Sequence, residues 1–420
     1  MTFTFVPPFL VFLLGALLAS ALPARFMSWT VISCALVAGI LAFIAPEGVY
    51  ASIGFFKYSL ELGVGGNIER ISQVALCLAV MLIGIATTKQ TPCRYHAWGL
   101  VLAGLASGVL AAGDLISFFL FFELIVITTT VLIAAGRTPG SAAAALQFII
   151  IQLLASIVFK VGMSDFHHRF DSYSLSAVSQ PILESPLSWA LIIGLLVKVS
   201  AWPLAFLTPT AISKSIRSGQ LYLAALLPLA AVSSIWKIFN EQPDHLVFLV
   251  SGGLLILYGL IYGAQRRDAP VNQMAYGIAI LSGLALGLGA TTNGIVQPYA
   301  LGVLPVISVL ILLSAQQVQL QSVQADTTHP KESTSIPRLK DTDTVVNFIL
   351  LSALSPLATY LLHLWSIAYH KLHRFIELVI KKLEKLTGSK SPLGGHWGIG
   401  LTCLWIIVLL GLYGTTYLLF

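Results

Sequence analysis

The feature that most constrains this chain is a nearly unbroken succession of apolar runs, each roughly 17–22 residues long. An α-helix of that length crosses the hydrocarbon core of a bilayer. Inside lipid only helices and closed barrels satisfy their own backbone groups, and runs this long indicate helices. The expected spans are 3–22, 28–45, 70–88, 96–112, 115–135, 141–162, 187–207, 220–239, 246–264, 272–290, 295–315, 345–366 and 398–419.

The charge content supports this interpretation. Charged residues make up 10% of the chain and hydrophobic residues 57%, whereas a soluble domain carries about 25% charged residues. The first run lacks the basic segment of a signal peptide, and further spans follow it, so we expect it to be the first membrane helix. The sequence therefore predicts an all-α polytopic membrane protein with about 13 transmembrane helices.

Two segments depart from the apolar pattern. Residues 316–344 are rich in Ser, Thr and Gln, which predicts a polar linker. Residues 368–387 form an amphipathic pattern, with leucines on one face and lysines on the other, typical of a helix in the membrane interface. Much of the net charge of +6 lies here, so anionic lipid headgroups are the expected ligands of 370–386 and nucleic acid is not. Docking onto a partner subunit is the alternative.

Several classes of chemistry have no support in the sequence. The four cysteines are scattered without the CxxC spacing of metal sites, and no phosphate-binding loop, haem-attachment motif or metalloprotease motif occurs. We therefore predict no cofactor, no metal and no catalytic residue in this chain. Intrinsic enzymatic activity is not expected.

Lys198 is the polar residue that the pattern makes most unusual. It lies within the apolar run 187–207, and Pro203 and Pro209 are expected to interrupt the helix before a short polar segment resumes it. An ammonium at membrane depth costs several kcal/mol and usually has an aqueous cavity or a partner. Broken helices beside such charges form ion sites in many transporters. The alternative is a lysine that extends from a kinked helix to the interface.

Glu123 is the natural partner for this lysine. It lies nine residues into the apolar span that begins near Asp114. Burial disfavours a charged carboxylate and a nearby ammonium favours it, so protonation of the two groups would be coupled. Such a pair can serve as an element of a proton relay.

The remaining polar residues in the spans have plainer interpretations. Gln147, Gln152 and Ser156 share one face of their span, where they either line water or bond neighbouring helices. The threonines 128–130 are expected to bond their own helix backbone. Lys237 lies at a helix end, which favours an anchor at the interface.

These motifs together resemble the antiporter-like, proton-conducting subunits of respiratory complex I, Mrp-type antiporters and membrane-bound hydrogenases. The stretch DLISFFLFFEL is similar to the segment that carries the family's essential glutamate, which the resemblance places at Glu123. The resemblance places the family's central lysine at Lys198, because Pro203 and Pro209 keep the expected spacing in a broken helix. It implies inverted five-helix repeats, each with a discontinuous helix.

The sequence departs from this family at two positions expected to hold lysines, one on the helix after the broken one and one in the second repeat. The lysine expected on the helix after the broken one falls near Leu229, and Ser308 stands about where the second repeat would have a lysine. The second repeat is therefore expected to be incomplete. Asp114, Gln147 and Ser308 remain candidates for lining a pathway.

The resemblance suggests an organisation and two classes of function. We expect N-terminal helices in 1–95, a first repeat in 96–240, a partial second repeat in 241–315, the polar linker, and C-terminal helices in 345–420. The first function is proton translocation through the Glu/Lys pair in a cation/proton antiporter or a complex-I-like assembly, with protons and Na⁺ as ions. The alternatives are a non-conducting structural or coupling subunit, or a subunit for inorganic-carbon uptake. In each case the partners are other membrane subunits, in a bacterial inner membrane, and an NADH-quinone oxidoreductase-like or hydrogenase complex is one possible host.

Overall fold

The computed structural model divides into two compact units, Met1–Glu332 and Ser333–Phe420. All described residues belong to the first unit. The predicted spans 345–366 and 398–419 and the predicted interfacial helix 368–387 lie outside the described residues. The structure describes residues 2–55, 58–64, 66–86, 93–136, 138–175, 185–239, 246–265, 270–291 and 297–328.

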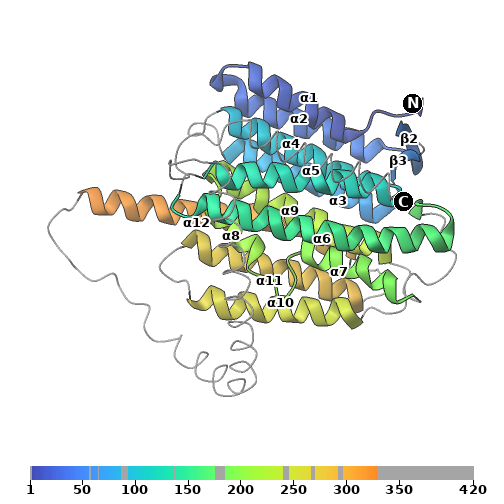
Figure 1. The fold of residues 1–420 in the computed structure, drawn as a ribbon. Coiled ribbons are helices and arrows are strands. Elements are labelled where there is room, and N and C mark those ends of the chain that lie inside the picture. Colours follow the sequence, from blue (N-terminus) through green and yellow to red (C-terminus); the bar gives the residue numbers. More distant parts are fainter. Residues whose placement is uncertain are drawn as a thin grey trace, which may run out of the picture. The chain divides into compact units, whose positions relative to one another are not determined.

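The described part is a bundle of apolar helices that run side by side (Figure 1). Among its residues, eight helices are long and apolar enough to cross a membrane, and three shorter apolar helices accompany them. The predicted class, a helical polytopic membrane protein, is confirmed. The helices are α1 (Pro8–Ala21), α2 (Met27–Ile44), α3 (Asn67–Ala86), α4 (Cys93–Ala111), α5 (Leu115–Ala134), α6 (Ser141–Phe170), α7 (Trp189–Lys198), α8 (Leu207–Lys214), α9 (Arg217–Phe239), α10 (Leu246–Gln265), α11 (Pro270–Thr291) and α12 (Gln297–Thr328), with short 3₁₀ turns η1 (Ala24–Phe26) and η4 (Pro186–Ser188).

Local chemistry explains where several helices begin. Pro8 and Pro270 occupy the first positions of α1 and α11, where a helix needs no N–H from the residue. Asp114 precedes α5, and its side chain accepts hydrogen bonds from the backbone N–H groups of Ile116 and Ser117. Such caps satisfy backbone donors that a helix leaves free at its start.

The core of the bundle is α9. Within its apolar window 94% of residues are buried, against 39% for α2 and for α10. It contacts α3, α4, α12 and α11 as well as both halves of the broken helix, α7 and α8. Because α9 is buried on all sides, its residues face protein, and the outer helices present apolar side chains outward.

A small antiparallel sheet, which we did not predict, closes one end of the bundle beside the N-terminus of α3 (Figure 1). Its strands are β1 (Thr2–Phe3), β2 (Gly48–Phe55) and β3 (Tyr58–Val64), in the order β1-β2-β3. Buried side chains of the sheet pack against the start of α1 and the end of α4 in one apolar cluster, which includes Tyr50, Leu62, Phe9 and Ala111. The sheet therefore fastens the loop after α2 to the bundle.

The predicted polar linker, which follows the eleventh predicted span, begins with helical residues. α12 continues to Thr328, so the first part of the predicted linker 316–344 is helical, and 329–344 lies outside the described residues. Gln316 in this helix donates to the backbone carbonyl of Arg217 and to Gln220, which joins α12 to the start of α9.

Candidate functional site

The helix that carries Lys198 ends at that residue. The next residues fold back on the helix: the N–H of Ser200 donates to the carbonyl of Val197 at 2.9 Å, and that of Ala201 to Leu196 at 2.8 Å. Ser200 has a φ of 59°. A left-handed residue with these two bonds is the Schellman ending of a helix. Lys198 thus lies in the last turn of α7, where the helix dipole favours a cation.

The chain then crosses a short break before α8 begins. Pro203 lies in the break, where it cannot donate a backbone hydrogen bond, and the residue before a proline is disfavoured in helical conformation. The hydroxyls of Ser200 and Thr208 hydrogen bond across the break at 2.8 Å. Pro209 is the third residue of α8, where its missing N–H costs nothing, so it belongs to the resumed helix and not to the break.

Three side chains from three helices meet at the end of α7. Lys198 Nζ lies 3.4 Å from Glu123 Oε1 of α5 and 3.0 Å from Ser156 Oγ of α6. The Ser156 hydroxyl also donates to Glu123 Oε1. A hydroxyl both donates and accepts, so it can accept from the ammonium while it donates to the carboxylate. Glu123, Ser156 and Lys198 therefore form one connected cluster.

The cluster is almost sealed from solvent on the lysine side. The Lys198 side chain is 1% exposed and that of Glu123 is 13% exposed. The ammonium lies 5.1 Å from the centre of the Phe122 ring, at a distance typical of cation–π contacts. Glu123 is thus the more accessible member of the pair.

Close helix packing holds these groups together. A side chain at Gly194 of α7 would meet the backbone of Phe159 in α6 at 2.9 Å, and one at Gly162 of α6 would meet the backbone of Leu191 at 2.5 Å. The Gln152 amide of α6 also donates to the Val197 carbonyl at 3.5 Å. The two glycines let α6 and α7 approach, as small residues do between membrane helices.

This arrangement can hold a proton in more than one place. An ammonium, a hydroxyl and a carboxylate joined by hydrogen bonds let a proton move between lysine and glutamate with little motion of heavy atoms. Burial makes each charge costly without the other, so their protonation states are coupled. The geometry therefore allows a switch between a paired charged state and a separated neutral state.

Asp114 has a different environment. One carboxylate oxygen accepts from the N–H groups of Ile116 and Ser117, and the other accepts from the Glu61 N–H of β3 and from the Ser117 hydroxyl. All four donors are local to the start of α5 and to the sheet. This carboxylate therefore caps α5 and ties the sheet to it, two to three helical turns away from Glu123.

The other two candidates from the sequence are separate from the cluster. Gln147 is half-buried on α6, nine residues before Ser156. Ser308 is buried in α12 and donates to the carbonyl of Leu304 at 2.7 Å, in its own helix. α12 packs against α3, α9 and α11, away from the lysine-bearing helix.

Two polar residues, Ser156 and Lys237, make contacts that the sequence did not predict. Ser156 was recognised only as part of a polar helix face, although its spacing of four residues from Gln152 was the available signal. Lys237, which we expected to anchor at the interface, instead donates to the carbonyl of Leu110 at 2.8 Å. Thr128 and Thr130 bond their own helix as expected, whereas the buried Thr129 hydroxyl has no hydrogen-bond partner in the described part of the chain.

A buried lysine–carboxylate pair thus lies at a broken helix in a bundle of apolar helices. Comparison with known sequences gives the particular family. Residues 112–294 match the family described as "NADH:quinone oxidoreductase/Mrp antiporter, TM", so this part of the chain is a domain of that family. The match includes α5 to α11 and hence all three members of the cluster.

Named relatives extend beyond this domain. The chain is 28% identical over 294 residues to a subunit of a probable K⁺/H⁺ antiporter of Rhizobium meliloti (strain 1021), covering 60% of this chain and 52% of that protein. It is 22% identical over 231 residues to a subunit of a Na⁺/H⁺ antiporter of Alkalihalophilus pseudofirmus, covering 52% and 47%. The chain thus spans about half the length of these curated relatives.

The fold itself is known from solved assemblies. A chain of respiratory complex I from Thermus thermophilus superposes with a TM-score of 0.63, at 20% identity, over 74% of this chain and 70% of that one. At this identity the likeness concerns the fold alone. The described bundle therefore shares its fold with that chain of complex I.

Proposed function

We propose that this chain is an ion-translocating membrane subunit of a multisubunit cation/proton antiporter or a complex-I-like assembly. The Glu123–Ser156–Lys198 cluster is its central proton-transfer element. The observation that carries this proposal is the buried hydrogen-bonded path from Lys198 through Ser156 to Glu123 at the end of a broken helix. Two relatives are named as subunits of K⁺/H⁺ and Na⁺/H⁺ antiporters, which supports cation exchange as the class of activity.

In this mechanism the neighbouring subunits control whether Lys198 and Glu123 are in contact. When Lys198 is drawn toward Glu123, both groups are charged and stabilise each other. When a neighbouring subunit weakens that contact, the ammonium releases its proton, which Ser156 can pass to Glu123 by donating its own hydrogen and accepting another. Glu123, the more exposed member of the pair, then releases the proton from the cluster. The other membrane subunits are thus the necessary partners.

The test measures proton-coupled cation exchange by the intact complex in membrane vesicles. A pH-sensitive dye inside the vesicles reports proton movement when Na⁺ or K⁺ is added. Glu123→Gln and Lys198→Ala are expected to lower the rate on the order of 100-fold, the scale of removing a proton-transfer group. Lys198→Arg is expected to fail as well, because arginine keeps its charge and does not release a proton.

Surface variants provide the controls. Lys214 donates to the Pro139 carbonyl at an exposed site, and Glu47 pairs with Arg70 at the surface. Lys214→Ala and Glu47→Gln should leave the rate within about twofold, since exposed ion pairs contribute little. Assembly of every variant is checked on a native gel. Normal exchange by assembled Glu123→Gln and Lys198→Ala complexes would show that the cluster does not conduct.

A second candidate is a structural or coupling subunit without conduction. Leu229, where the second lysine was expected, is fully buried, and Ser308 is satisfied by its own helix. A complete route for protons through this chain would therefore have to use other groups. This candidate predicts that deletion of 368–390 removes the complex from a native gel, while Glu123→Gln has little effect on exchange.

A further inference from the structure

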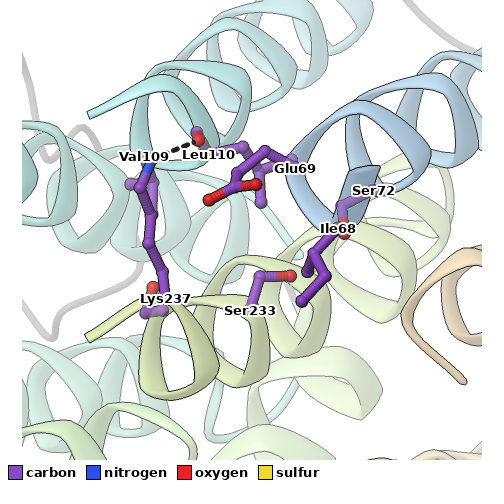
Figure 2. A pocket seen from close by; sticks show the side chains of 8 residues that line it. Ile68, Glu69, Ser72, Val109, Leu110, Ser233 and Lys237 are labelled. Carbon is purple, nitrogen blue, oxygen red and sulfur yellow. Dashed lines mark hydrogen bonds between the residues drawn. The ribbon is translucent and has the colours of Figure 1, made fainter. Parts of the chain in front are cut away.

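A second cluster of polar groups lies where α3, α4 and α9 meet, at the end of the bundle near the sheet. It surrounds a small cavity lined by Glu69, Ser72, Ser233, Ser234 and Lys237, with Val109 and Leu110 beside them. Figure 2 shows the Glu69 carboxylate pointing toward the Lys237 side chain. The central cluster uses none of these residues.

Lys237 is held at this cavity by a polar contact within the bundle. Its Nζ donates to the carbonyl of Leu110 near the end of α4, at 2.8 Å (Figure 2). Its charge interacts with the carboxylates of Glu69 and Asp114. Asp114 already accepts four hydrogen bonds at the start of α5, and Glu69 is the carboxylate that lines the cavity beside Lys237. The neighbouring Arg70 pairs with Glu47 and bonds the Ala45 carbonyl.

Two buried hydroxyls indicate what fills the cavity. In the described part of the chain, Ser72 Oγ and Ser233 Oγ have no hydrogen-bond partner, although these residues are 0% and 5% exposed. Leaving a buried hydroxyl unsatisfied costs about 1–3 kcal/mol. The cavity has space for about one water molecule, and several polar groups surround it. Bound water would satisfy both hydroxyls and reach the charged groups.

We propose that this cavity is a hydrated proton-exchange site in which water bridges Lys237, Glu69 and the two serine hydroxyls. The Lys237 ammonium gives one proton to the water, and the water gives one of its own protons to the Glu69 carboxylate. The products are a neutral amine, a neutral carboxylic acid and an unchanged water molecule. The site would exchange protons at the end of the bundle, which rests on the proposed function of the chain as a proton carrier.

Hydration is tested first, by radiolytic hydroxyl-radical labelling of the intact complex with mass spectrometry. Bound water converts to radicals beside buried side chains, so Val109 and Leu110 are expected to label well above Leu76. All three are nearly or fully buried, and Leu76 lies on α3 within the core, which makes it the matched dry control. Labelling of Val109 and Leu110 no higher than that of Leu76 would overturn the hydrated site.

Proton exchange is tested by two variants that remove the ability to transfer a proton and keep a polar side chain of similar size. Lys237→Arg keeps a cation that can donate to the Leu110 carbonyl but cannot release a proton. Glu69→Gln keeps a polar side chain without its charge. Both are expected to lower proton-coupled exchange about 10-fold, less than loss of a central proton-transfer group. If the lysine only anchors α4, the arginine variant keeps normal exchange and the proposal is wrong.

The same assay separates this proposal from the proposed function. Glu47→Gln, at the same end of the bundle, serves as the surface control. If Glu123→Gln abolishes exchange while Lys237→Arg and Glu69→Gln behave as wild type, only the peripheral site is overturned. If Glu123→Gln leaves exchange intact, the central relay is overturned, and the cavity variants still report on proton exchange at their own site.

Discussion

Two regions of the described bundle differ in the side chains that they bury at the positions expected to hold lysines. In the region of α5 to α7, a broken helix presents Lys198 to Ser156 and Glu123 in the interior. In the region of α9 to α12, the positions where lysines were expected hold Leu229 and Ser308, both buried. At these positions the first region buries a charge pair, and the second buries a leucine and a hydroxyl that its own helix satisfies.

This difference indicates what the charge pair is for. The second region shows that the bundle packs without buried charge at such positions. A buried ion pair contributes little or nothing to stability compared with apolar residues of similar volume. The Glu123–Lys198 pair is therefore not explained by the needs of the fold. The role in moving charge proposed above gives a reason for the pair that packing does not.

The largest expected effect comes from removing half of the pair. Glu123→Ala leaves the Lys198 ammonium buried without its carboxylate, which should reduce the free energy of unfolding by about 3–5 kcal/mol. The double variant Glu123→Ala/Lys198→Met removes both charges and should recover most of that loss, which makes the first region resemble the second. Thermal unfolding of the purified complex in detergent measures both. A double variant no more stable than the single one would contradict this account.

The next effect tests how tightly the two regions are packed. Gly194→Ala should reduce the free energy of unfolding by about 1–3 kcal/mol, because the new methyl group would lie 2.9 Å from the Phe159 Cα atom. Gly253 on α10 has nothing within 4 Å of an added methyl group. Gly253→Ala should be neutral or stabilising, since alanine favours helix. Equal effects of the two substitutions on the thermal midpoint would show that α6 and α7 are not closely fitted.

A smaller effect separates the two carboxylates of α5. Asp114→Ala removes a helix cap and should cost about 0.5–2 kcal/mol. Because Asp114 also accepts from the Glu61 N–H, backbone amides of β3 should exchange hydrogen faster in this variant. Glu123→Gln should leave exchange in β3 unchanged. Hydrogen exchange read by mass spectrometry over residues 58–64 makes the comparison, and faster exchange in both variants would mean that the two carboxylates act as one unit.

The helices and the break were predictable because apolar length and proline position act locally. The pairing of Glu123 with Lys198 was predicted from two charges within apolar spans and from the family resemblance, and the structure brings the two side chains together. The sheet was missed because its strands lie in a short stretch between membrane spans. The alternation in Ser59, Leu60, Glu61 and Leu62 was the available signal, with Leu62 facing the core.

Two further features depended on packing between distant segments, which a sequence does not display. Ser156 joins the site because two glycine contacts hold α6 against α7, and its spacing from Gln152 indicates a polar helix face without indicating which helix that face contacts. Lys237 looks like an anchor by position. It contacts Leu110 because the C-terminal ends of α9 and α4 lie side by side.

The last comparison is between two buried serines, one in each region, and includes the substitution with the smallest expected effect, Ser308→Ala. Ser156→Ala removes the hydroxyl between Lys198 and Glu123 and should cost about 1–3 kcal/mol, the scale of a hydrogen bond to charged groups. Ser308→Ala removes only a bond to its own helix at Leu304 and should change stability by less than about 0.5 kcal/mol. Both substitutions delete one buried oxygen, so the difference between their thermal shifts isolates the interaction of Ser156 with the charge pair. Equal shifts would mean that Ser156 contributes to the first region as an ordinary helix residue, and that Lys198 and Glu123 interact without it.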